Sequence, residues 1–278
     1  MKILVAIPAF NSESSLGTLL KEVKVYAENI LVVDDGSSDR TSSVARAENV
    51  EVLRHASNRG LSQAMVSVFS YARERDYTHL IALDSDLQHL PKYIPKFCEF
   101  PPEVDLVHGM RFTNPLLAPG CKVASNLMGS CLFEAVFGPF IGDVTCGYRR
   151  YKISSFWDGP FGHGYEFIYR SLIYAVNLNL QIQACPMEAI YPQDHLLSTK
   201  RLELIGFFRA CSLGQMPDPL RDAAALVEKG QDFKLCAEGI AFYGYYLERN
   251  DTYLLQCDLP AAVRKYSHHE DRSLPAGL

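Results

Sequence analysis

Two aspartates stand two positions apart in the segment ALDSDLQH, residues 82–89, directly after an apolar run. A carboxylate at the edge of a hydrophobic core is costly unless it is paired, hydrogen-bonded or bound to a metal. In an extended segment, the side chains of residues i and i+2 point to the same side. Asp84 and Asp86 therefore offer the oxygen ligands that hard divalent cations prefer, and the amide of Gln88 follows two residues later.

The segments before and around this pair alternate between strand and helix patterns. Short apolar runs end in polar turns, and amphipathic stretches that begin with Asn, Ser, Thr or Gly separate them. Strands are expected within residues 3–7, 29–34, 50–56 and 78–83, and helices within 11–23, 40–48 and 60–75. This alternation predicts an α/β fold with a doubly wound, mostly parallel sheet flanked by helices.

Ligands of such sheets bind beyond the carboxyl ends of the strands. Each expected strand in the first 90 residues leads into polar side chains at that edge. These are Asn11 and Glu13, Asp34 and Asp35, Asn58 and Arg59, and Asp84 and Asp86. The sequence therefore predicts one polar rim that carries several carboxylates.

The second half of the chain shows a different sequence pattern. Further strands are expected within 105–112 and 180–188, and a helix at 166–177. Residues 114–142 form an apolar, partly helical stretch. After about residue 215 only helical spacing remains, which predicts a main domain at 1–215 and a helical appendage at 216–278.

Composition narrows the class of protein. A net charge of −5 argues against general nucleic-acid binding. The eight cysteines form no C-x-x-C pair, so a structural zinc site is not expected and the scattered thiols are typical of a cytoplasmic protein. Apolar runs are too short to span a bilayer, so membrane contact should be peripheral, at the inner face. The apolar segment 127–142 could serve that contact, the core or a homodimer face.

Six segments together resemble a known family: VAIPAFNSESSL, ILVVDDGSSDRT, NRGLSQA, ALDSDLQHLPKYIP, VHGMRF and DVTCGYRRY. In this order they resemble the family 2 glycosyltransferases of GT-A fold, a Rossmann-like fold that binds nucleotide-diphosphate sugars. The similarity is greatest to the dolichol- or polyprenol-phosphate mannosyltransferases, whose usual pattern is D-A-D-L-Q-H-P-P, and it covers roughly residues 1–210. It implies inverting transfer of a hexose from GDP-mannose or a UDP-hexose, with Mg²⁺ or Mn²⁺.

The resemblance also implies roles for individual residues. Metal ligands would be Asp84, Asp86 and Gln88. Nucleotide or phosphate contacts would come from Pro8, Phe10, Glu13, Val33, Asp35, Asp84, Ser85 and Lys122. Catalytic functions would fall to Asp86, to Arg111 at the diphosphate, to Asp143, and to Arg149 near the acceptor.

The acceptor is less defined than the donor. A polyprenyl phosphate brings an oxygen that is already nucleophilic, so basic residues such as Lys122 and Arg149 would only position it. An alcohol acceptor needs a carboxylate base, for which Asp143 and Glu166 are candidates. The family's R-x-x-G-x-S-K element corresponds here to DHLLSTKRL, which lacks the arginine and the glycine.

Alternatives to the polyprenyl phosphate reaction therefore remain open. One is a soluble glycosyltransferase that acts on a hydroxyl of a small molecule, glycan or peptide. Another is a catalytically inactive module that only binds a nucleotide sugar. Nucleotidyl transfer ranks last, because it usually needs a glycine-rich basic loop after the first strand, and PAFNSESSL is acidic there.

Overall fold

The computed structural model describes residues 1–111, 126, 129, 130, 133, 134, 137–156, 159 and 161–191. The predicted appendage at 216–278, the domain boundary at residue 215 and Lys122 lie outside the described residues. Within the described part, no helix is both long enough and apolar enough to cross a bilayer.

The described part is built on one mixed sheet, with strand order β3-β2-β1-β4-β6-β5-β7. Its strands are β1 (Ile3–Ala9), β2 (Ile30–Asp34), β3 (Glu51–Arg54), β4 (His79–Ala82), β5 (Leu106–Met110), β6 (Arg149–Lys152) and β7 (Ile182–Pro186). The helices are α1 (Leu16–Val23), α2 (Thr41–Ala47), α3 (Leu61–Glu74), α4 (Ile94–Glu99) and α6 (Glu166–Asn177), with 3₁₀ turns at Pro91–Tyr93 and Ile153–Ser155.

The first four strands follow the sequence-based prediction. β1 pairs in parallel with β2 and with β4, and β2 pairs in parallel with β3. Helices α1, α2 and α3 connect them in the expected alternation. The predicted α/β class with a mostly parallel sheet is therefore confirmed.

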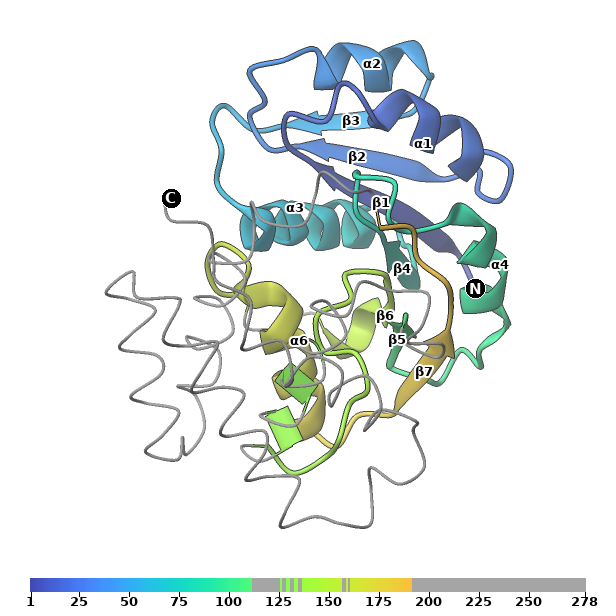
Figure 1. Cartoon of the computed structure of the whole chain (residues 1–278), viewed down its shortest axis with the longest axis vertical. Coiled ribbons are helices and arrows are strands. Elements are labelled where there is room, and N and C mark those ends of the chain that lie inside the picture. Colours follow the sequence, from blue (N-terminus) through green and yellow to red (C-terminus); the bar gives the residue numbers. More distant parts are fainter. Residues whose placement is uncertain are drawn as a thin grey trace, which may run out of the picture.

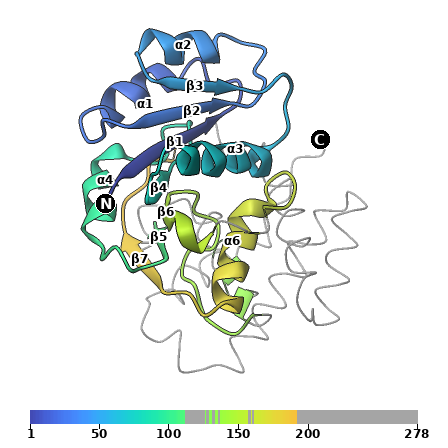
Figure 2. The same ribbon diagram turned by 180° about the vertical axis from the view of Figure 1, so that it is seen from behind.

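Helices cover both faces of this sheet (Figures 1 and 2). Alternate side chains of a strand point to opposite faces, so Leu4 and Ala6 pack with α3 and α6, whereas Val5 and Ile7 pack with α1, α2 and α4. The buried side chains of α1 are Leu16, Leu19, Leu20 and Val23, a helical stripe with spacing i, i+3, i+4 and i+7. Complete burial of each of these side chains contributes about 2 kcal/mol.

Strand β6 was not predicted from the sequence. It lies between β4 and β5 and is antiparallel to both. Its sequence, Arg-Arg-Tyr-Lys, has none of the apolar character expected of a central strand. Yet both arginines are fully buried, one on each face of the sheet.

Arg150 is buried because it satisfies backbone carbonyls. Its guanidinium donates hydrogen bonds to the carbonyl oxygens of Phe100 and Pro101, both at 2.7 Å, and to those of Phe97 and Val104. These carbonyls lie at the end of α4 and in the turn that follows, where helical partners are missing. A cation also interacts favourably with the negative end of a helix dipole. Arg150 therefore joins the turn after α4 to the centre of the sheet.

We expect Arg150→Met to destabilise the fold by about 3 kcal/mol, because it keeps the volume but leaves several buried carbonyls without donors. Urea unfolding measures this change. Arg46→Met, at an exposed position of α2, is the matched control and should change stability by less than about 0.5 kcal/mol. Equal stability of the two variants would contradict the assigned role of Arg150.

Candidate functional site

The carboxyl ends of β1, β2, β3 and β4 lie along one edge of the sheet, because these strands run parallel. The loops that follow them carry the polar residues predicted to form a rim. Backbone hydrogen bonds tie neighbouring strand ends together, from Asp35 N to Ala9 O and from His55 N to Asp34 O, both 2.9 Å. The structure thus brings the predicted loops together.

The D-x-D segment lies directly after β4, with partly exposed side chains; that of Asp84 is 42% exposed. One carboxylate oxygen of Asp86 accepts a hydrogen bond from the backbone N–H of Gln88 at 3.0 Å. Between them, Leu87 has a φ of +66°, which reverses the chain tightly at a cost for a residue with a side chain. Such strain is often found where a loop must hold a particular shape.

The oxygen set of this segment fits a hard divalent cation. Within the described residues, no group of three or more His, Cys, Asp or Glu side chains could hold a metal by itself. A cation bound by Asp84 and Asp86 would therefore take further ligands from Gln88, from a diphosphate or from water. That incomplete protein shell is typical of Mg²⁺ sites that bind substrate phosphates.

Ser85 connects this segment to the β1–α1 loop. Its hydroxyl lies 2.8 Å from that of Ser12, and its carbonyl accepts a hydrogen bond of 2.6 Å from the hydroxyl of Ser15. Ser15 is the N-cap residue of α1, but its side chain makes no capping bond. The hydroxyl expected to cap the helix instead holds the loop that carries the two aspartates.

Gly147, in the segment before β6, leaves room for the Asp84 carboxylate. A Cβ atom at this position would lie 2.7 Å and 2.9 Å from the two carboxylate oxygens of Asp84. Contacts this short do not occur in folded proteins, so any side chain at 147 would displace the carboxylate. The antiparallel strand β6 therefore helps to place an aspartate of the D-x-D segment.

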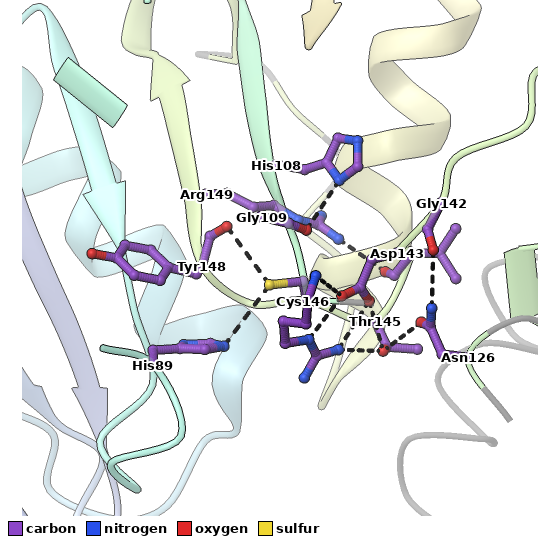
Figure 3. A network of polar contacts seen from close by, with 12 residues as sticks. His89, His108, Gly109, Asn126, Gly142, Asp143, Thr145, Cys146, Tyr148 and Arg149 are labelled. Atoms are coloured by element: carbon purple, nitrogen blue, oxygen red, sulfur yellow. Dashed lines mark hydrogen bonds and ion pairs between the residues drawn. The ribbon is translucent and has the colours of Figure 1, made fainter. Parts of the chain in front are cut away.

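The buried ring of His89 supports the same segment. The ring is buried, and its Nδ1 accepts a hydrogen bond of 3.0 Å from the backbone N–H of Asp84. Its Nε2 faces the Cys146 sulfur at 3.9 Å (Figure 3). Burial, aided by the positive charge of Arg111, lowers the pKa of His89 to about 4. The neutral ring with an occupied Nδ1 forms no ion pair with the Asp84 carboxylate 3.5 Å away.

Arg111 and Asp143 form a buried, bidentate ion pair. The guanidinium donates to the two carboxylate oxygens at 2.8 Å and 2.9 Å, and it also reaches the Thr145 hydroxyl at 2.7 Å. That hydroxyl in turn donates to the side-chain oxygen of Asn126 (Figure 3). Burial opposes ionisation of Asp143, but Arg111 outweighs it, so the pKa of Asp143 lies below its ordinary value of 3.8.

Two loops form the other end of the rim. Asn11 accepts a hydrogen bond from the backbone N–H of Ser38, and Glu13 accepts two from Arg40, at 2.9 Å and 3.2 Å. Phe10, in the same loop, has 46% of its surface exposed. Its ring is available to a ligand and does not belong to the core.

Asp35 is almost completely buried, and its carboxylate organises the β3–α3 loop. It accepts hydrogen bonds from the His55 ring at 2.6 Å and from the backbone N–H groups of Arg59 and Gly60. Pro8 lies on the neighbouring strand and lines a small hollow together with Asp84 and Gly147.

Three sequence-based assignments need correction. Val33 is 0% exposed in the core between β1 and β3, so its side chain cannot contact a nucleotide. Arg149 is also 0% exposed and donates to the Val144 and Ile168 carbonyls and to the Ser171 hydroxyl, because the alternation of β6 turns it toward α6. Its side chain is therefore occupied by contacts within the core. Asp143 is locked by Arg111 and is poorly suited to act as a base.

Sequence reasoning missed two supporting residues, Gly147 and His55. Gly147 and His55 carried no local signal, because their roles depend on contacts with residues distant in the chain. His89 lies beside the D-x-D segment, and only the structure shows from which backbone N–H group its ring accepts a hydrogen bond.

Glu166, the second candidate base, is 3% exposed and paired with Arg170 at 2.6 Å.

Comparison with known proteins gives consistent matches. A family model described as glycosyl transferase family 2 matches residues 4–114. An uncharacterized protein of Methanocaldococcus jannaschii is 32% identical over 203 residues, which cover 69% of this chain and 83% of that protein. The undecaprenyl-phosphate mannosyltransferase of Micrococcus luteus is 31% identical, with coverage of 55% and 67%.

A solved structure supports the fold assignment. Glucosyl-3-phosphoglycerate synthase from Mycobacterium tuberculosis, in complex with uridine diphosphate, is similar with a TM-score of 0.60 and 18% identity. The match covers 78% of this chain and 81% of that chain. This likeness confirms the predicted GT-A fold.

We expect Asp143→Asn to destabilise the protein by about 3 kcal/mol at neutral pH, because it leaves the buried Arg111 charge without its partner. The depressed pKa of Asp143 means that the ion pair contributes fully above pH 3.8 and is lost as the pH falls through the folded-state value. The stability difference between the wild type and this variant should therefore shrink below pH 3.8 in urea unfolding. Asp76→Asn, at an exposed turn, is the control; a pH-independent difference would contradict the assignment.

Proposed function

The chain belongs to glycosyl transferase family 2, and on that premise we propose that this glycosyltransferase moves a hexose from a nucleotide sugar to a polyprenyl phosphate. The donor is GDP-mannose or a UDP-hexose, and the reaction inverts the anomeric centre. The observation that carries the proposal is the partly exposed Asp84–Asp86 pair at the end of β4, held by Ser85, His89 and Gly147.

The D-x-D segment would hold a divalent cation to which the donor diphosphate binds. Bound Mg²⁺ or Mn²⁺ supplies positive charge that stabilises the leaving nucleoside diphosphate. Asp84 and Asp86 would hold this cation, with Gln88 as a further ligand. One similar structure was solved with Mn²⁺ and UDP-glucose, which supports this combination for the fold.

The remaining rim residues bind and orient the donor. Phe10 presents an exposed ring beside which a base can stack. Glu13 and Asp35 define the loops on either side of it. Arg111 lies in the network next to His89 and contributes positive potential on the diphosphate side, although Asp143 neutralises much of its charge.

The state of the two candidate bases, Asp143 and Glu166, supports a polyprenyl phosphate acceptor. Asp143 is held by Arg111, and Glu166 is buried against Arg170. An alcohol must lose a proton to react, whereas a phosphate monoester is already an oxyanion at neutral pH. Relatives named undecaprenyl-phosphate mannosyltransferase and polyprenol monophosphomannose synthase, the latter from Mycolicibacterium smegmatis, support the same acceptor class.

The assay is transfer of a labelled hexose from GDP-mannose and from UDP-glucose to undecaprenyl phosphate in detergent, with Mn²⁺ or EDTA. We expect a lipid-extractable product that needs both Mn²⁺ and the lipid. Asp86→Asn should reduce the rate at least 100-fold, because the cation loses a charged ligand. Asp76→Asn should keep wild-type activity.

Other outcomes distinguish the alternatives. Product formed only on a soluble hydroxyl would overturn the lipid phosphate acceptor and favour a soluble transferase. Nucleotide binding without turnover on any acceptor would indicate an inactive binding module. Full activity of Asp86→Asn in EDTA would refute the metal assignment.

We expect Gly147→Ala to raise the Mn²⁺ concentration for half-maximal activity about tenfold, because the added methyl displaces the Asp84 carboxylate. Titration of Mn²⁺ at saturating donor measures this effect. Gly17→Ala on α1 is the matched control, since its methyl would meet a Val44 methyl of α2 at 3.3 Å. An unchanged Mn²⁺ dependence in folded Gly147→Ala would show that Asp84 does not depend on this space.

A further inference from the structure

A chain of three hydrogen-bonded side chains, two of them buried, lies beside the rim, away from the D-x-D segment. Asp35 follows β2, His55 follows β3, and Ser67 lies in α3. The His55 Nδ1 is 2.6 Å from an Asp35 oxygen, and its Nε2 is 2.9 Å from the Ser67 hydroxyl. His55 and Asp35 are 6% and 4% exposed.

The direction of these hydrogen bonds follows from Asp35. Its carboxylate accepts the backbone N–H groups of Arg59 and Gly60, at 3.0 Å and 2.7 Å, and so acts as an acceptor. The His55 Nδ1 must therefore carry the proton that points to Asp35. In the neutral ring, Nε2 then accepts the Ser67 O–H, which fixes this tautomer.

This order of groups resembles a hydrolytic triad, but its surroundings do not suit that chemistry. Ser67 lies inside α3 (Leu61–Glu74), where backbone N–H groups are used by the helix. Stabilisation of an oxyanion needs N–H donors directed at the reacting carbonyl. The chain of bonds therefore has a different role, which its connections to the rim indicate.

The chain of bonds sets the shape of the β3–α3 loop. Asp35 holds the N–H groups of Arg59 and Gly60, and Gly60 precedes α3 with a φ of +84°. Gly36 lets the β2–α2 loop approach the β3–α3 loop closely, since a Cβ at position 36 would lie 2.3 Å from the backbone of Ser57. Two rim loops thus meet at one carboxylate, which His55 orients.

The location of this carboxylate matches one end of a nucleoside diphosphate. The strand order places β2 two positions from β4, across β1, which corresponds to about 10 Å between the Asp35 end and the D-x-D end. The exposed ring of Phe10 follows the intervening strand β1. With the diphosphate at β4, the nucleoside extends toward β2 and β3.

We propose that His55 is a positioning residue for nucleoside recognition, which holds Asp35 and, through it, the β3–α3 loop against the base and ribose of the donor. Ser67 supports it by fixing the ring. The inference rests on the proposed function, because it assumes a nucleotide sugar donor. It assigns His55 no contact with the sugar or the diphosphate.

The experiment compares two probes by calorimetry with Mn²⁺ present. Nucleotides (UDP and GDP) report on the nucleoside end, and inorganic pyrophosphate reports on the D-x-D end alone. We expect His55→Ala to weaken binding of the preferred nucleotide about tenfold and to leave pyrophosphate binding unchanged, since one charge-assisted hydrogen bond is lost. The KM for the donor should rise in parallel, while kcat stays the same.

Two further variants and a control sharpen this test. His55→Asn should recover most of the nucleotide affinity, because its amide N–H can replace the Nδ1–H. Ser67→Ala should weaken nucleotide binding about threefold, and it decides the question if His55→Ala does not fold. Ser70→Ala, one turn of α3 further on and exposed, should match the wild type.

The possible failures are distinguishable. Equal losses of nucleotide and pyrophosphate affinity would indicate general damage to the fold and overturn the role of His55. Wild-type nucleotide binding by His55→Ala, or by Ser67→Ala where His55→Ala does not fold, would overturn it as well. If the wild type binds pyrophosphate but no nucleotide, the proposed function itself fails, and this inference fails with it.

Discussion

The parallel pairing of β1 with β2 and with β4 is the constraint on which the candidate site depends. The hydrogen-bonded register sets Ala6 beside Ala82 and Ala9 beside Asp34, so the carboxyl ends of these strands reach the same edge at nearly the same height. Side chains far apart in the sequence then meet without long connecting loops. The contacts of Ser85 with Ser12 and Ser15 follow from this register.

The antiparallel strand β6 adds a second constraint, which concerns the burial of charged side chains. It brings two arginines into the core, where their terminal guanidinium nitrogens donate to backbone carbonyls or a hydroxyl. The segment before it carries Asp143, which neutralises Arg111, and Gly147, which makes room for Asp84. A strand that looks polar in the sequence therefore supports both the sheet and the D-x-D segment.

Charged groups around the rim divide into two classes. Asp35, Asp143 and Glu166 are buried and engaged by cations or N–H donors, so they hold structure. Asp84 and Asp86 remain partly exposed at the strand end, where a cation and a diphosphate can reach them. This division agrees with the proposed function, in which an anionic acceptor attacks a donor whose leaving group is bound to a metal.

The strand and helix alternation of the first 90 residues, the parallel sheet and the polar rim could be predicted from the amino-acid sequence alone. Those features depend on local periodicity and on where apolar runs end, which a single sequence displays. The place of β6, the burial of Val33 and Arg149, and the supporting roles of His55, His89 and Gly147 depend on how the folded chain packs. A residue such as Gly147 acts through the space it leaves for Asp84, 63 positions earlier in the chain. Such contacts exist only once the strands have paired, so no local pattern can encode them.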